Sequence, residues 1–243
     1  MSRKSILFFA AVMIASLSAC GGDPEPAEDS KVEYVVKISN VSTDDTHTLS
    51  TGESLPIGLS PGAFAVSDSG GVFFVEGEAA SMALERLAEL GDPSKLKEAA
   101  AGHDDVRDHG IAGNIENADY EESPILPGAD ASFVLEFDRL DSAHLELAMM
   151  LGPSNDTFLA PVGGSLDLTQ FLDETGEVDI TDKFQWWDAG TEKSEPLGEG
   201  PSQASKAPDL TTGDPDEVGT VRAADGVLEP DFVSTVKITI RPR

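Results

Sequence analysis

Hydrophobic and polar residues alternate with a period of two in several short stretches of this 243-residue chain. In the first stretch Tyr34, Val36 and Ile38 alternate with their neighbours, before a polar turn at 40–46. Alternation of this kind, rich in β-branched residues and bounded by turn residues, predicts half-buried β-strands. Further strands are predicted at 71–76, 132–137, 144–151, 166–168, 178–180 and 233–240.

Many short strands joined by glycine and proline turns are typical of an all-β antiparallel sandwich or barrel. One or two short inserted helices interrupt it. Residues 78–90 are apolar at helical spacing and are followed by Gly91 and Pro93, which predict a helix that ends there, and a second helix is predicted over 93–101. Residues 192–230 contain five prolines and no aromatic residue, and predict a long surface loop that returns for the last strand.

The N-terminus predicts export and a lipid anchor. Arg3 and Lys4 precede an apolar run over 6–14 and small residues up to Cys20, which together are typical of a secretory signal. The run is too short for a membrane span, which needs about 20 apolar residues. The sequence Leu17-Ser18-Ala19-Cys20 resembles the lipobox of bacterial lipoproteins, in which the cysteine is acylated, in part with palmitate. The alternative is an ordinary cleaved signal that ends near a cysteine, but Cys20 is the only cysteine of the chain.

These features predict three regions: a signal peptide over 1–19, a lipidated, disordered acidic tether over 20–32, and one folded domain over 33–243. The absence of an aspartate directly after Cys20 favours the outer membrane if the host is Gram-negative. Loss of residues 1–19 removes two of the 16 basic residues and none of the 45 acidic ones, and leaves a net charge of about −31. A surface this acidic excludes nucleic acid and anionic lipid as partners through basic contacts.

Conventional catalytic motifs are not found. The four histidines lack metal-ligand spacing such as H-E-x-x-H, and the segment HDDVRDH at 103–109 is interpreted as a solvated loop. No glycine-rich phosphate loop is found either. We therefore expect a protein that is not an enzyme.

Two acidic segments are candidates for a metal site. Asp156 follows an apolar strand, and Asp188 and Glu192 follow both tryptophans of the chain. Gly190 would let the chain fold back so that Asp188 and Glu192 face one point, where Asp156 could join them. Carboxylates, carbonyls and water are the oxygen ligands that Ca²⁺ prefers, with a coordination number of about 6–8. The alternative is two acidic loops beside a partly buried pair of tryptophans.

The same segments resemble the spondin domain, found in F-spondin, in mindin and in many bacterial lipoproteins. The pieces that carry the resemblance are YVVKISN at 34–40, PG at 61–62, EAA at 78–80, LPGA at 126–129, MMLGPSNDTF at 149–158, DAGTE at 188–192 and VKITI at 236–240.

The resemblance implies a C2-like antiparallel β-sandwich that binds Ca²⁺ at one end through Asp156, Asp188 and Glu192. Glu192 stands where the animal proteins have an aspartate, and the disulfides of the animal proteins are missing here. The implied function is a lipid-anchored, non-enzymatic binding or adhesion module of the cell envelope, with a protein or a glycan as partner. The alternatives are an envelope hydrolase that uses the acidic cluster and a purely structural envelope lipoprotein.

Overall fold

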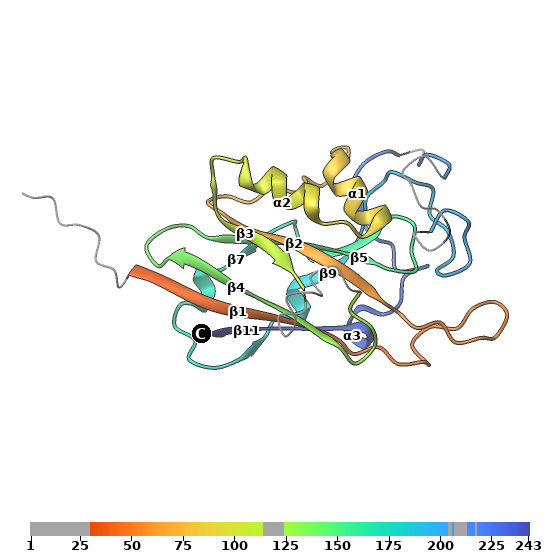
Figure 1. The fold of residues 1–243 in the computed structure, drawn as a ribbon, viewed down its shortest axis with the longest axis horizontal. Coiled ribbons are helices and arrows are strands. Elements are labelled where there is room, and N and C mark those ends of the chain that lie inside the picture. Colours follow the sequence, from red (N-terminus) through yellow and green to blue (C-terminus); the bar gives the residue numbers. More distant parts are fainter. Residues whose placement is uncertain (1–29, 114–123, 204–205, 207–212, 217) are drawn as a thin grey trace, which may run out of the picture.

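The computed structural model describes residues 30–113, 124–203, 206, 213–216 and 218–243. They form two antiparallel β-sheets that pack face to face, and two helices lie across the outer face of the larger sheet (Figure 1). The predicted fold class, an antiparallel β-sandwich with short inserted helices, is therefore confirmed. The predicted signal peptide and most of the predicted tether lie outside the described residues.

The smaller sheet has four strands in the order β4-β1-β11-β8. Strand β1 (Lys31–Asn40) lies between β4 (Asp130–Asp138) and β11 (Val236–Pro242), and β8 (Val178–Asp179) extends the β11 edge. Four of the predicted strands belong to this sheet, where one face is buried and the other is exposed: 34–38, 132–137, 178–180 and 233–240. Because one face of each strand is buried and the other is exposed, hydrophobic and polar residues alternate along it, and this alternation predicts the strand.

The larger sheet has the order β10-β9-β6-β5-β2-β3, with β7 paired to the end of β5. Its strands are β2 (Leu59–Ser67), β3 (Val106–Ala112), β5 (His144–Leu151), β6 (Thr157–Pro161), β7 (Leu166–Asp167), β9 (Phe184–Asp188) and β10 (Arg222–Ala223).

The helices pack on the larger sheet. Helix α1 (Met82–Leu90) begins later than predicted because the Ser81 hydroxyl caps it by accepting the Leu84 N–H at 3.2 Å. It ends at Gly91, which has φ +67°, as the sequence predicts. Helix α2 (Ser94–Ala101) confirms the second predicted helix. The remaining helical turns are η3 (Thr169–Phe171), η4 (Thr181–Lys183) and α3 (Phe232–Thr235).

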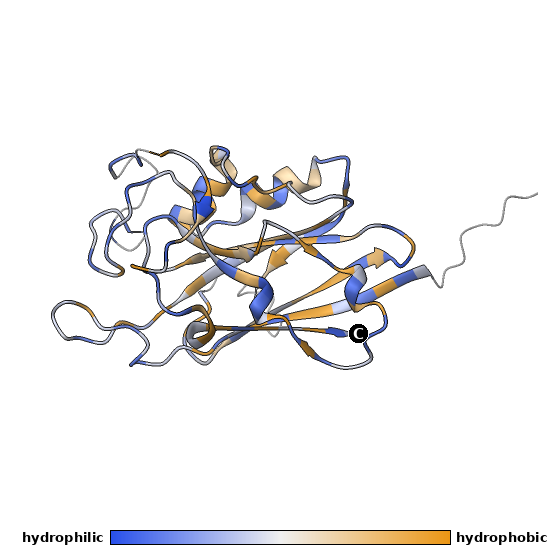
Figure 2. Cartoon of the chain, turned by 180° about the vertical axis from the view of Figure 1, so that it is seen from behind, coloured by the Kyte–Doolittle hydropathy of each residue, from blue (hydrophilic) through white to orange (hydrophobic). Residues whose placement is uncertain are grey.

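Two apolar layers hold these elements together. One lies between the sheets and includes Ile38, Leu147 and Trp186. The other lies between the larger sheet and the helices, where small alanines of the sheet let Leu84 and Leu87 of α1 approach closely. Figure 2 shows the hydrophobic positions concentrated along the strands and the hydrophilic ones in the loops.

One predicted strand is wrong, and one long strand of the larger sheet was not predicted. Residues 71–76 form an irregular loop, because the N–H groups of Val72 and Phe73 donate to the buried Glu146 carboxylate at 3.0 and 2.8 Å and not to a neighbouring strand. Strand β2 was not predicted, because all of its residues are buried between the second sheet and the helices, which leaves no alternation to detect.

Other boundaries also differ from the prediction. The segment 103–109 is not all loop, since β3 begins at Val106 and pairs with β2. The last strand begins only at Val236, because Asp231 caps the helical turn α3 by accepting the Ser234 N–H at 3.1 Å. Strands β6 and β9, both short, were not predicted. None of the helices in the described parts of the chain has the length and apolar character that a membrane crossing requires.

Candidate metal site

The two acidic segments meet at one end of the larger sheet. Strand β6 pairs with β9 so that Thr157 lies opposite Asp188, and the Ala189 N–H donates to the Asp156 carbonyl at 3.1 Å. Residues far apart in the sequence are thereby joined at neighbouring strand ends. The sequence-predicted meeting of the two segments is therefore present in the fold.

Asp156 holds the turn that follows β9. Its Oδ2 accepts the backbone N–H groups of Thr191 and Glu192, both at 3.1 Å, and the Thr191 hydroxyl lies 3.4 Å away. The side chain is buried, with a relative exposure of 1%. Gly190 makes the turn possible: its φ is +69°, and a Cβ there would lie 2.3 Å from the Thr220 carbonyl oxygen.

Asp188 is already paired with a cation inside the protein. Its Oδ1 accepts the Gly190 N–H at 2.7 Å, and its Oδ2 accepts from Arg222 at 2.7 Å and from the Ser194 hydroxyl at 3.3 Å. Arg222, on the edge strand β10, also binds Asp216 at 2.7 Å. No sequence pattern pointed to Arg222, because it lies in the predicted long loop, far along the chain from Asp188.

Glu192 is buried without a full set of partners. Its relative exposure is 6%, and its Oε2 accepts no hydrogen bond from any residue that the structure describes. Gly213 lies directly against this carboxylate, because a Cβ built there would be 2.2 Å from Glu192 Oε1. A buried carboxylate oxygen without a donor is costly unless a cation or a proton satisfies it.

Glu89 is a fourth buried acid near this site, and no pattern in the sequence points to it. It lies at the end of α1 with a relative exposure of 4%. At about 100° per residue, Glu89 falls almost opposite the apolar face of the helix, so periodicity predicts exposure. Its burial therefore comes from the tertiary structure, in which Thr191 lies within hydrogen-bond reach of Glu89, and the local sequence pattern does not record such a contact.

Three of these acids hold protons more tightly than ordinary carboxyl groups. Burial, followed by the charge of Asp188, raises the pKa of Asp156 to about 7. Burial, followed by the charges of Glu89 and Asp156, raises the pKa of Glu192 to about 8. Burial also raises the pKa of Glu89 to about 7, although a hydrogen bond with Thr191 opposes the shift. In Asp188 the rise from burial is opposed by the Gly190 N–H and by Arg222.

The chemical type of the donor atoms at this site suits a hard cation, but the side chains are not arranged around one point. Within the described residues, no three Asp, Glu, His or Cys side chains already surround a point where a metal ion could sit. The donors are nevertheless all oxygens, and Glu192 Oε2 is buried and unsatisfied. No described Lys or Arg forms an ion pair with Glu89, Asp156 or Glu192. Binding of an ion would therefore require rotation of the long glutamate side chains.

One further buried acid has a structural explanation. Glu146, on β5, has a relative exposure of 1%. Both of its oxygens are satisfied, by the N–H groups of Val72 and Phe73 and by the Ser67 hydroxyl at 3.4 Å. Glu146 therefore anchors the loop after β2 and leaves no oxygen free for a ligand.

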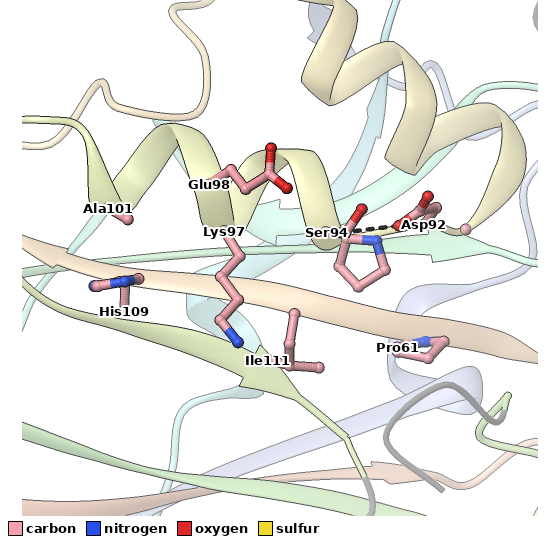
Figure 3. A pocket seen from close by; sticks show the side chains of 10 residues that line it. Pro61, Asp92, Ser94, Lys97, Glu98, Ala101, His109 and Ile111 are labelled. Carbon is pink, nitrogen blue, oxygen red and sulfur yellow. Dashed lines mark hydrogen bonds between the residues drawn. The ribbon is translucent and has the colours of Figure 1, made fainter.

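A separate cleft of about 680 Å³ opens between α2 and the strands β2 and β3 (Figure 3). Lys97 reaches from α2 toward Ile111, and Pro61 and His109 lie on the strands below. Asp92, at one end, already binds Arg86 at 2.6 Å and accepts the Ser94 N–H at 2.9 Å. None of the predicted site residues lines this cleft, so it is a different place on the molecule from the acidic cluster.

No protein-family model matches this chain, and no curated protein matches it at a significant level. The resemblance to the spondin domain therefore stays a prediction that rests on the motifs and on the residues they contain.

Proposed function

We propose that this protein is a lipid-anchored protein of the cell envelope with a spondin-like sandwich that binds Ca²⁺. It acts as a non-enzymatic binding or adhesion module toward a protein or a glycan. The observation that supports calcium best is the Glu192 carboxylate, whose Oε2 is buried and has no partner among the described residues. Two further buried acids, Glu89 and Asp156, lie close enough to raise its pKa.

The residues of the chain already hold the two loops near each other. Asp156 accepts two N–H groups of the turn after β9, while Arg222 binds Asp188 and Asp216. Ionisation of the remaining buried acids would place like charges in the same small volume. Ca²⁺ would supply positive charge to carboxylate oxygens there, with Asp156 and Glu192 as ligands on two different loops. Binding would thus stabilise the end of the sandwich that carries both loops.

Calcium binding is expected to be measurable as heat and as a rise in melting temperature. The full chain in detergent is titrated with CaCl₂ by calorimetry, and its melting is followed in calcium and in chelator. At a free calcium concentration about 100 times Kd, mass action adds about 2.7 kcal/mol to the free energy of unfolding. The Glu192→Gln variant is expected to lose most of the binding heat, because an amide cannot ionise to supply the carboxylate ligand that calcium prefers.

The matched control for this titration is Glu98→Gln, which makes the same substitution at an exposed position of α2. It should bind calcium like the unaltered protein. Absence of binding heat in the unaltered protein, together with equal melting in calcium and in chelator, would show that the acidic cluster is not a calcium site.

The lipid anchor is tested separately in the cells that make the protein. Radiolabelled palmitate is expected to be incorporated into the unaltered chain and not into a Cys20→Ser variant, because Cys20 is the only thiol that could start the lipid attachment. The same substitution should move the protein from the membrane fraction to the soluble fraction. Equal labelling of both chains would exclude Cys20 as the site of acylation.

A further inference from the structure

The cleft beneath α2 lies apart from the acidic cluster and has the size of a small-molecule binding site. Its volume is about 680 Å³, and the ligand pockets of proteins span about 300–1,000 Å³. It opens between α2 and the strands β2 and β3, and all of the residues that line it belong to the described parts of the chain (Figure 3). A ligand bound here would therefore not depend on the proposed calcium binding.

The register of β3 places two of its side chains on the cleft side of the sheet. His109 lies opposite Ala65 of β2. Ile111, two residues later, lies opposite Ala63. Both alanines are buried in the layer beneath the helices, and opposed residues of an antiparallel pair share a face of the sheet. His109 and Ile111 therefore stand on the face that α2 covers, so that one polar and one apolar side chain border the cleft.

The two acids that line the cleft are each paired with a cation from outside its lining. Asp92 binds Arg86 at 2.6 Å. Glu98 binds Lys95 at 2.7 Å, and its side chain extends away from that of Lys97 (Figure 3). The negative charge of the lining is therefore already balanced by other side chains.

Lys97 is the charge of the lining that these pairs leave over. It forms no ion pair with any acidic residue that the structure describes. The side chain is exposed and reaches from α2 toward Ile111, and Pro61 lies on the strand below (Figure 3). An accessible ammonium group beside apolar side chains fits a ligand that has one negative group and an apolar body.

We propose that this cleft binds a small organic monoanion, a carboxylate with a compact apolar body. The Lys97 ammonium would pair with the carboxylate, while Ile111 and Pro61 would contact the body. His109 offers a further hydrogen-bonding group on the same side of the sheet. The net charge of −29 disfavours ligands with several negative charges, because the field of the whole protein repels them more strongly than it repels a monoanion.

Binding is tested with benzoate as the probe and with benzamide, a neutral ligand of nearly the same shape, for comparison. The full chain in detergent carries ¹³C-labelled isoleucine methyl groups, and NMR follows their signals while each ligand is added. The Ile111 signal is assigned with an Ile111→Val variant. We expect a saturable shift of this signal with benzoate, because an aromatic ring would dock on the side chain. Benzamide should bind at least about fivefold more weakly, since it cannot form the ion pair with Lys97.

A charge-removing variant tests the role assigned to the lysine. Lys97→Met keeps most of the apolar stem and should keep the fold, because the residue is exposed. It is expected to weaken benzoate binding by at least about fivefold and to leave benzamide binding unchanged. The matched control is Lys237→Met, the same substitution at an exposed position of β11 in the other sheet, which should bind benzoate like the unaltered protein.

Three results would overturn the proposal. The first is the absence of a saturable shift of the Ile111 methyl signal with benzoate. The second is equal affinity for benzoate and benzamide, or unchanged benzoate binding in Lys97→Met, because the charge would then have no part in recognition. The third is a shift of Ile238, which is buried between the sheets, as large as that of Ile111, since this would indicate a general effect on the protein.

Discussion

Substitution of Gly190 by alanine is expected to lower the free energy of unfolding by about 3 kcal/mol or more, one of the two largest effects predicted for this protein. The residue has φ +69°, a left-handed conformation that alanine adopts at a cost of about 1–2 kcal/mol. The added Cβ would also meet the Thr220 carbonyl oxygen at 2.3 Å and its amide nitrogen at 2.7 Å. Backbone atoms cannot move aside as a flexible side chain can.

Relief of that clash would move Thr220 and, two residues later, Arg222. Arg222 pairs with Asp188 both in the β9–β10 ladder and through its guanidinium. We therefore expect the substitution to weaken the turn that carries Glu192 as well as to lower the melting temperature. Chemical denaturation followed by tryptophan fluorescence measures the loss, since both tryptophans lie on β9.

Gly226→Ala is the matched control for this prediction. Gly226 has a similar φ of +72°, but an added Cβ there meets no atom within 4 Å. It should cost only the conformational strain of about 1–2 kcal/mol. The difference between the two variants therefore isolates the close approach to Thr220. Equal losses in both variants would show that the approach imposes no constraint.

In the absence of calcium, the stability of the protein is expected to fall steeply as the pH rises from about 5 to about 7. Asp156 and Glu89 have pKa values of about 7 and Glu192 one of about 8 in the folded chain. In the unfolded chain such groups titrate near 4. The folded state therefore binds more protons than the unfolded state in this window, and each rise in pH favours unfolding.

One extra proton in the folded state corresponds to a slope of about −1.4 kcal/mol per pH unit. With three raised carboxyl groups, we expect a slope at least that steep in chelator. Asp216 and other carboxyl groups with lowered pKa values act in the opposite sense, but only below about pH 4, outside this window. Urea denaturation at several pH values in chelator measures the slope.

Two comparisons test the cause of that slope. Saturating calcium should flatten it, because the ion stabilises the ionised carboxylates and replaces their protons. Glu192→Gln should also make it shallower, whereas Glu98→Gln, at an exposed position, should leave it unchanged. A stability that is constant between about pH 5 and about pH 7 in chelator would show that these carboxyl groups are not protonated in the folded protein.

The sequence by itself determined the fold class and the half-buried strands. Tyr34, Val36 and Ile38 each point into the layer between the sheets, and all three are buried. A strand with one exposed and one buried face can be recognised from its own sequence, because polar and apolar residues alternate along it. The same holds for α1, whose Leu84 and Leu87 lie on one face, and for Gly190, where the turn requires a left-handed residue.

Only the tertiary structure determined which elements are buried on both faces and which distant groups they contact. Ala63 and Phe64 of β2 are buried against the helices and against the other sheet, respectively, so neither reveals a period. Phe73 resembles a strand residue, yet its N–H binds Glu146, 73 positions further along the chain. Such choices depend on which distant group lies within hydrogen-bond reach of a buried donor in the folded chain, and the local sequence pattern carries no information about that.

The candidate site shows the same division. Asp156, Asp188 and Glu192 could be selected from the sequence because both acidic segments follow apolar stretches and resemble motifs of the spondin domain. The burial of Glu89 and the pairing of Asp188 with Arg222 depend on contacts between segments that are far apart in the chain. Local sequence determines which residues can carry charge at this end of the sandwich, whereas the packing of α1, β9 and β10 determines which of those charges are left without a partner. Burial and electrostatic pairing are properties of the folded protein, because both depend on contacts that do not exist in the unfolded chain.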